Sequence, residues 1–458
     1  MSKLVAHRKK SPDAPKGPLF VGTTRITRDM LTKGQKGADE VFGKWYFSKK
    51  SKKNQILRIG GGAGSGKTFF LQYLIDKYGF EQDTCYVMAY TGQAVSVLRQ
   101  NGVLGNTIHS TITYPKETPI IDKRTGKPIY KRGIPLTRLT FVPMKSLPAS
   151  VKLLVIDEAS FLPKELEDIL KGYNIPILEI GDPIQLPPVA SQQVFTLESL
   201  DYFIDGVMRQ NVDSEIYDLA TRLRMHKNVN TAKYHKDVRF LYAQPTIEET
   251  FYRFLPFFRD ANIIIVSTNK QRQIITDLYR KEILKTDSPY PIAGEKMICR
   301  KNNRALTLDQ FNLANGTIGI SMDDVGRSQV DKRVGTFFMD FKPDVVADTD
   351  LYYDNLMCDS HFLKKPYGES DELGYKRPGE KFEYAHAITC HLAQGGQFNR
   401  VIYMDAFNGD PDYLARIRYT AVTRAREMFF YIIPHTDYPG WCDLRNIEER
   451  EAGMLSYY

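Results

Sequence analysis

The chain alternates short apolar runs with longer segments of helical spacing. Residues 56–59 form such a run, and apolar positions at helical spacing follow over residues 69–78. A continuous apolar run lies at residues 151–156, further strands are expected at residues 84–89 and 175–180, and helices are expected at residues 35–47 and 91–100. Strands that are apolar along their whole length are typical of parallel sheets covered by helices on both faces. The first half of the chain is therefore predicted to be an α/β domain.

A second alternation of the same kind occupies the rest of the chain. Helices are expected at residues 214–224, 272–284 and 412–423, and strands at residues 263–266, 385–389, 400–405 and 428–433. Because strands and helices alternate again, the pattern predicts a second α/β domain.

Two segments break the alternation. Apolar segments at residues 120–121 and 128–130 flank the polar turn 122–127, which predicts a β-hairpin. Residues 115–147 hold eight basic and two acidic residues, which fits a wedge at a duplex fork and equally a solvated decoration. From residue 320 to residue 381 helical periodicity is lost and Gly, Asp and Tyr increase, so a small β-rich insertion is expected.

These patterns predict a division of the chain into domains and insertions. The expected parts are a flexible basic arm at 1–18, a first α/β domain at 19–113 and 149–205, a hairpin insertion at 114–148, a second α/β domain at 206–319 and 382–435, a β-rich insertion at 320–381, and a C-terminal tail at 436–458. The arm carries adjacent basic residues and prolines, which indicates a disordered tail more than a nucleic-acid contact.

A glycine-rich loop joins the first apolar run to its helix. It reads Gly61, Gly62, Ala63, Gly64, Ser65, Gly66, Lys67, Thr68. Strand, glycine loop and helix in this order form a phosphate-binding loop, whose backbone N–H groups and helix N-terminus hold an anion. Lys67 is expected to reach the β- and γ-phosphates of a nucleotide and Thr68 to hold Mg²⁺ through its hydroxyl. A plain glycine-rich turn would not need all eight residues in this context.

Four other polar residues fit the same site. Asp157 and Glu158 end an apolar strand, where Asp157 would bind Mg²⁺ and Glu158 would take a proton from the attacking water. Gln185 lies in the turn at residues 181–188, where it would sense the γ-phosphate, although a turn fixed by two prolines also explains the segment. Gln35 precedes the loop, and its amide suits the edge of adenine, although a single Gln is weak support.

Composition narrows the partners of this site. The 63 Lys and Arg against 54 Asp and Glu give a formal charge of +9, which favours a polyanion. The 27 Tyr and 25 Phe offer flat faces for bases, although such residues more often fill a core. Five scattered cysteines argue against a zinc module and a disulfide framework. Because the sequence has no apolar stretch of membrane-spanning length, no membrane partner is expected.

The motifs taken together resemble superfamily 1 helicases, specifically the 1B branch with the phage Dda-type and RecD-like enzymes. The resemblance covers about residues 31–433, with the motifs in the family's order. It is carried by residues 61–68, 157–158, 181–188, 209–210, 389–398 and 419–426. It implies two RecA-like parallel-sheet domains with ATP between them, a strand-separating hairpin at 114–148 and an SH3-like insertion in the β-rich segment.

The resemblance also implies roles for residues whose function the sequence patterns alone do not indicate. Arg209 and Arg424 would be arginine fingers from the second domain, Gln35 would contact adenine, and Gln397 stands where a glutamate often holds the ribose. The residues expected along single-stranded DNA are Tyr90, Thr91, His109, Thr268, Asn269, Thr389, His391 and Gln394. Three positions depart from the family pattern: Tyr90 replaces a usual proline, Leu392 a common lysine and Gln397 the glutamate.

The function expected from this resemblance is an ATP-dependent DNA helicase that moves 5′ to 3′ on single-stranded DNA in replication, recombination or repair. ATP and Mg²⁺ are the expected cofactors. Single-stranded DNA and a duplex fork are the expected partners, with single-strand-binding or replisome proteins as further candidates, in a bacterial or phage-infected bacterial cytoplasm. The alternatives are an RNA helicase of the same superfamily and a DNA-stimulated ATPase without processive unwinding. A P-loop kinase lacks a second half such as residues 422–426, and intact Lys67, Asp157 and Glu158 argue against an inactive binding module.

Overall fold

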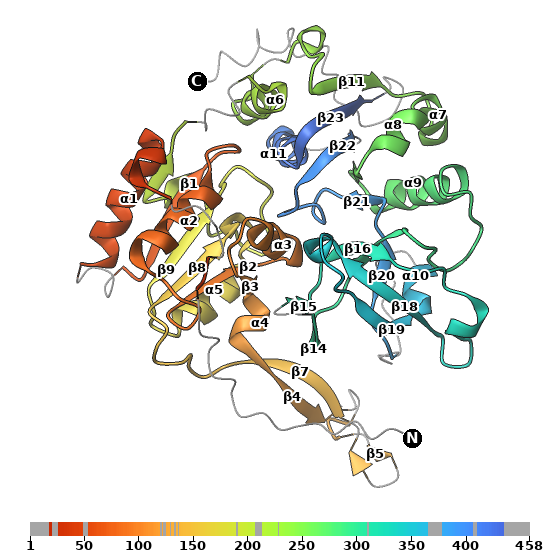
Figure 1. Cartoon of the computed structure of the whole chain (residues 1–458), viewed down its shortest axis with the longest axis horizontal. Coiled ribbons are helices and arrows are strands. Elements are labelled where there is room, and N and C mark those ends of the chain that lie inside the picture. Colours follow the sequence, from red (N-terminus) through yellow and green to blue (C-terminus); the bar gives the residue numbers. More distant parts are fainter. Residues whose placement is uncertain are drawn as a thin grey trace.

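The computed structural model consists of two α/β domains and two β-rich insertions (Figure 1). It describes residues 18–20, 26–48, 54–119, 121, 125–128, 130–131, 134–135, 137–188, 191–206, 213–227, 229–308, 311–364, 378–405 and 410–434. The expected basic arm except for Pro18, the expected arginine finger Arg209 and the expected C-terminal tail lie outside these residues.

The first domain is built on a parallel sheet of six strands. They are β1 (Ile56–Gly61), β2 (Cys85–Ala89), β3 (Asn106–Thr107), β8 (Leu153–Asp157), β9 (Ile177–Gly181) and β10 (Tyr202–Ile204), in the order β10-β1-β9-β8-β2-β3. One face packs on α1 (Lys33–Tyr46), α2 (Lys67–Tyr78) and α3 (Gly92–Gln100), and the other on α4 (Ile108–Ile112) and α5 (Lys164–Lys171). Burial on both faces explains why these strands read as continuous apolar runs.

The second domain repeats this plan with five parallel strands. They are β11 (Val238–Tyr242), β12 (Ile263–Val266), β21 (Ala387–Thr389), β22 (Phe398–Met404) and β23 (Ala425–Ile433), in the order β11-β23-β22-β12-β21. Helices α6 (Glu215–Arg224) and α11 (Pro411–Val422) cover one face, and α7 (Ile247–Arg253), α8 (Leu255–Asp260) and α9 (Asn269–Glu282) cover the other. The predicted pair of parallel-sheet domains is confirmed.

An antiparallel ribbon leaves the first domain after α4. Its arms, β4 (Thr113–Pro119) and β7 (Thr137–Pro143), pair over their whole length and extend away from the sheet (Figure 1). Beyond them Ile121 bridges Pro128, and β5 (Tyr130–Lys131) pairs with β6 (Ile134–Pro135). The hairpin insertion is therefore present, but its principal arms lie outside the apolar segments from which it was predicted.

The second insertion is a mostly antiparallel sheet beside the second domain. Its strands are β13 (Lys296–Cys299), β16 (Ile318–Ser321), β17 (Val330–Asp331), β18 (Thr336–Pro343), β19 (Tyr353–Asp359) and β20 (Phe382–Tyr384), accompanied by the hairpin of β14 (Asn303–Leu308) and β15 (Phe311–Leu313) and by α10 (Ser360–Lys364). Its core includes Phe337, Phe341 and Phe382. The sheet extends beyond both ends of the range 320–381 that the sequence suggested.

Single turns of 3₁₀-helix connect several of these elements. They are η1 (Arg28–Met30), η3 (Ala159–Phe161), η4 (Leu197–Ser199), η6 (Thr231–Lys233), η7 (Arg327–Gln329) and η8 (Asp344–Val346). Among the helices of the described residues, none combines the length and the apolarity that crossing a lipid bilayer requires.

Candidate nucleotide site between the two domains

The glycine loop curls at the end of β1 and opens α2. Gly64 and Gly66 have φ of 74° and 72°, a left-handed conformation that glycine adopts without steric cost. Lys67 is the first residue of α2, and its Nζ donates to the carbonyl oxygens of Gly61 at 2.8 Å and Gly62 at 3.2 Å. The ammonium group therefore spans the loop, at the place where phosphate oxygens would lie.

Gln35 fastens α1 to this loop. Its Oε1 accepts from the N–H of Thr32, and its Nε2 donates at 3.1 Å to the carbonyl oxygens of both Ser65 and Gly66. The side chain is fully buried. Both ends of the amide thus have partners within the protein, and the expected contact with adenine stays a prediction.

Two carboxylates end the central strand β8 beside the loop. Asp157 is buried, and its pKa is raised to about 7, chiefly by burial and then by the negative charge of Glu158, while Lys67 acts in the opposite sense. Glu158 has a φ of 53°, and its Oε2 is buried without a hydrogen-bond partner among the described residues. Two adjacent carboxyl groups of this kind, with the Thr68 hydroxyl near the start of α2, are a donor set that suits Mg²⁺.

The turn after β9 meets the second domain. Oδ1 of Asp182 accepts from the N–H of Ile184, which closes the turn, and its other oxygen accepts from the hydroxyl of Tyr419. That same hydroxyl accepts at 2.9 Å from the N–H of Ala63 in the glycine loop. Tyr419, on α11 of the second domain, therefore joins both phosphate-side segments of the first domain.

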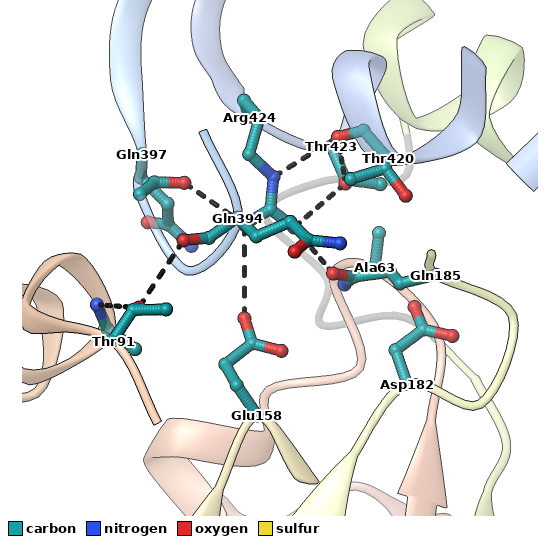
Figure 2. Close-up of polar contacts among 12 residues, drawn as sticks. Ala63, Thr91, Glu158, Asp182, Gln185, Gln394, Gln397, Thr420, Thr423 and Arg424 are labelled. Carbon is teal, nitrogen blue, oxygen red and sulfur yellow. Dashed lines mark hydrogen bonds and ion pairs between the residues drawn. The ribbon is translucent and has the colours of Figure 1, made fainter. Parts of the chain in front are cut away.

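Arg424 follows α11 and points into the cleft between the sheets (Figure 2). Its Nε and Nη1 donate to the carbonyl oxygens of Thr420 and Gly396, which hold the side chain within its own domain. Its Nη2 donates at 3.0 Å to Oε1 of Gln185, and its Nη1 lies 3.9 Å from Oε1 of Glu158. The structure thus brings together Gln185, Glu158 and Arg424, which the sequence analysis had assigned to one site.

Further polar contacts along α11 were not anticipated. Leu186 donates its N–H to Oγ1 of Thr420 at 3.1 Å, and Arg416 donates to the carbonyl oxygens of Pro183 and Gln185. Arg416, Tyr419 and Thr420 are related by three and four positions, so they share one face of α11, and Arg424 follows four positions after Thr420, beyond the end of the helix. The sequence shows this spacing, but it does not predict the contacted residues, which lie more than 220 positions earlier in the chain.

The residues expected along DNA fall into smaller groups. Thr91 caps α3 and donates weakly to the carbonyl of Gln394, which in turn contacts the carbonyl of Leu186. The rings of Tyr90 and His109 lie 6.0 Å apart, centroid to centroid, and Tyr90 is exposed.

The other expected contacts lie in the second domain. Thr268 caps α9, Asn269 is exposed, Thr389 ends β21, and the pKa of the partly buried His391 is lowered by burial. Gln397, expected at the ribose, is exposed and accepts from Arg426. All of these roles stay predictions.

Comparisons with known proteins agree with this architecture. A model described as an AAA domain matches residues 49–244, and a model described as a UvrD-like helicase C-terminal domain matches residues 384–430. Each parallel sheet is thus matched at least in part by its own family model.

Two curated relatives match part of the chain. An uncharacterised protein of Acanthamoeba polyphaga mimivirus is 29% identical over 184 residues, which cover 34% of this chain and 35% of the relative. The ATP-dependent DNA helicase Pif1 of Campylobacter jejuni is 28% identical over 151 residues, which cover 32% of each protein. The chain therefore spans about a third of the length of the curated relatives it matches.

Solved structures match nearly the whole chain. A crystal structure of Pif1 helicase from Bacteroides in complex with ADP-AlF3 and single-stranded DNA has a TM-score of 0.50 at 17% identity, covering 93% of this chain and 98% of that one. A structure of two coordinating Pif1 helicases that unwind forked double-stranded DNA has a TM-score of 0.51 at 17% identity, with the same coverage. These likenesses establish the fold.

The fold and the site define a P-loop protein of two RecA-like halves, with its phosphate loop facing an arginine of the second half. Its two halves match, in chain order, an AAA domain and a UvrD-like helicase C-terminal domain, and its fold is similar to that of the Pif1 helicase structures.

Proposed function

We propose that the protein is an ATP-dependent DNA helicase that moves 5′ to 3′ along single-stranded DNA. The observation that supports this most directly is the position of Arg424 between Gln185 and Glu158. A nucleoside triphosphate on the glycine loop would be held by the first domain and touched by a guanidinium group of the second. Its terminal phosphate would then join the two halves, and hydrolysis would release them.

Each side chain at the cleft has a part in this proposal. The loop N–H groups and Lys67 bind the phosphates, and Thr68 and Asp157 would hold Mg²⁺, which neutralises phosphate charge when bound. Glu158, with one carboxylate oxygen buried and unpartnered, accepts the proton of the attacking water. Arg424 exchanges Gln185 for the γ-phosphate as charge develops, an effect worth about 10³–10⁵ in rate for arginine fingers.

Movement on DNA would follow from the same cleft. Thr91 and Gln394 belong to different domains and meet across it, so a change in the cleft alters their spacing. If the exposed Tyr90 ring stacks on a base, the first domain has a grip on the strand that needs no particular sequence. Alternate grip by the two domains converts cycles of closure into steps. The direction of those steps comes from the family alone.

The direct experiment measures ATP hydrolysis with and without single-stranded DNA, and unwinding of duplexes that carry a 5′ or a 3′ overhang. We expect DNA to stimulate hydrolysis and only the 5′ overhang to support unwinding. Stimulation by RNA in place of DNA would favour an RNA helicase. Stimulation without unwinding would favour a DNA-dependent ATPase. Hydrolysis indifferent to any nucleic acid would refute the proposal.

A further inference from the structure

A second arginine of the second domain lies against the glycine loop. Arg224 is the last residue of α6, and a Cβ added to Gly62 would collide with its Nη1 and lie 3.4 Å from its Cζ. The same added Cβ would lie 3.7 Å from the hydroxyl of Tyr419. The guanidinium group thus lies directly against the backbone of Gly62 in the phosphate loop.

The Arg224 guanidinium group has no hydrogen-bond or ion-pair partner among the described residues. The side chain itself is half-buried. Favourable interaction with the C-terminal end of α6 is the simplest reason for a basic residue there. Arg222 occupies the same last turn, however, and it pairs with Asp218 one turn back at 2.8 Å. An interaction with the C-terminal end of α6 therefore does not explain why the Arg224 side chain lies against the glycine loop.

Two positively charged side chains lie close to Gly62. Nζ of Lys67 donates to the Gly62 carbonyl, and Arg224 lies against the same residue, so two cations meet at one turn of the loop. Their mutual repulsion is relieved when an anion lies between them. Guanidinium groups match phosphate geometry through paired N–H donors, which an ammonium group does not.

We propose that Arg224 binds the terminal phosphate of the triphosphate at the Gly62–Ala63 side of the loop, so that the site tells ATP from ADP. This inference rests on the proposed ATPase function and adds a phosphate contact to it. The second domain then approaches the triphosphate from two helices, through Arg224 at the end of α6 and Arg424 after α11.

The test compares R224A and R224K with R222A, a control on the same turn that keeps the arginine at 224. Binding of a non-hydrolysable ATP analogue and of ADP is measured for each protein, together with DNA-stimulated ATP hydrolysis. A charge-assisted contact of about 1.5–3 kcal/mol corresponds to about a 10- to 100-fold loss of analogue affinity in R224A. We expect ADP affinity to change little, R224K to recover only part of the loss, and R222A to match the wild type.

Two results would overturn the inference. Equal loss of analogue and ADP affinity would mean that Arg224 only supports the loop, and unchanged analogue affinity in R224A would mean that it contacts no phosphate. Thermal unfolding of each variant checks that the fold is intact. If the wild-type protein bound nucleotides but did not hydrolyse ATP, the proposed function would be wrong. The ratio of analogue affinity to ADP affinity would still show whether Arg224 contacts the terminal phosphate.

Discussion

Glu158 combines three features that together are unusual for a structural carboxylate. Its backbone has a φ of 53°, one carboxylate oxygen is buried without a partner among the described residues, and the other faces Arg424 at 3.9 Å. A left-handed backbone at a non-glycine residue costs about 1–3 kcal/mol, and such costs collect at functional sites. The left-handed backbone and the contact with Arg424 together mark Glu158 as a candidate functional residue.

Glu158→Gln should keep ATP binding and abolish turnover. The amide preserves the size of the side chain but cannot accept the proton of the attacking water. The measurement is DNA-stimulated ATP hydrolysis beside nucleotide affinity, with Glu165→Gln on the exposed face of α5 as the control. Near-normal hydrolysis in Glu158→Gln would remove its role as the base.

Residues within a contiguous motif could be predicted from the sequence pattern itself, whereas Arg424, which contacts the other domain, was predicted only through the family resemblance. Lys67, Asp157 and Glu158 were predicted as site residues because strand, turn and helix signals surround each of them, and their roles stay predictions. Tyr419 and Arg224 were missed because their partners in the glycine loop lie far away along the chain. No local pattern encodes a contact between positions 63 and 419.

At the scale of elements, the paired arms of the ribbon stand apart from the catalytic cleft. Strands β4 and β7 keep a regular register from the pair Thr113–Pro143 to the pair Pro119–Thr137. The sequence predicted a hairpin here but only its outer part, because the arms alternate polar and apolar residues too weakly to be seen as strands. The pairing shows a continuous ribbon, and its role as a wedge stays a prediction.

Shortening the ribbon should separate unwinding from hydrolysis. Replacing residues 119–137 by Asn-Gly keeps the pairs up to Thr118 and Arg138 and closes them with a two-residue turn. We expect DNA-stimulated ATP hydrolysis near the wild-type rate and loss of most duplex unwinding. Equal loss of both activities would show that the ribbon is structural, and unimpaired unwinding would exclude the wedge.

Strand β9 contains one buried carboxyl group, that of Glu179, among otherwise apolar residues. Glu179 is fully buried between β1 and β8, where it pairs with Arg58 at 2.8 Å, and Arg58 also pairs with Glu167. The pKa of Glu179 is raised from 4.5 to about 7, mainly by burial and against the lowering effect of Arg58. The folded protein therefore binds a proton at Glu179 more tightly than the unfolded chain does.

This shift gives stability a definite pH dependence. Because the folded-state pKa lies above the unfolded value, the contribution of Glu179 to the free energy of unfolding falls as pH rises from about 4.5 to about 7. Glu179→Gln lacks this titrating carboxyl group. The difference between its melting temperature and that of the wild type should therefore rise, in favour of the variant, from pH 5 to pH 8. Glu248→Gln, on an exposed site of α7, is the control. A difference that does not change with pH, or changes the other way, would contradict this assignment.

At the scale of the whole molecule, the fold is a pair of parallel sheets, and several candidate functional residues lie at the carboxyl ends of their strands. The glycine loop follows β1, Asp157 ends β8 and Thr389 ends β21. This edge is the usual place for ligands in open α/β sheets. The repeated alternation of strand and helix predicted both domains, whereas the docking of α11 on the first domain depends on tertiary contacts.

Polar contacts join the two domains across the cleft. Tyr419 reaches Ala63 and Asp182, Thr420 accepts from Leu186, and Arg424 reaches Gln185. These are polar contacts, which a charged ligand can replace more readily than an apolar interface. A triphosphate in the cleft would take over the Arg424 contact and so link the chemistry to the distance between the domains.

The central claim is that a residue of the second domain completes a nucleotide site in the first, and the rate of DNA-stimulated ATP hydrolysis in Arg424→Ala tests it most directly. Arg400→Ala, which removes an exposed ion pair with Asp260, is the matched control in the same domain. We predict a loss of at least about a thousandfold in Arg424→Ala, with the fold intact and the control unchanged. A rate within about tenfold of the wild type would contradict the account.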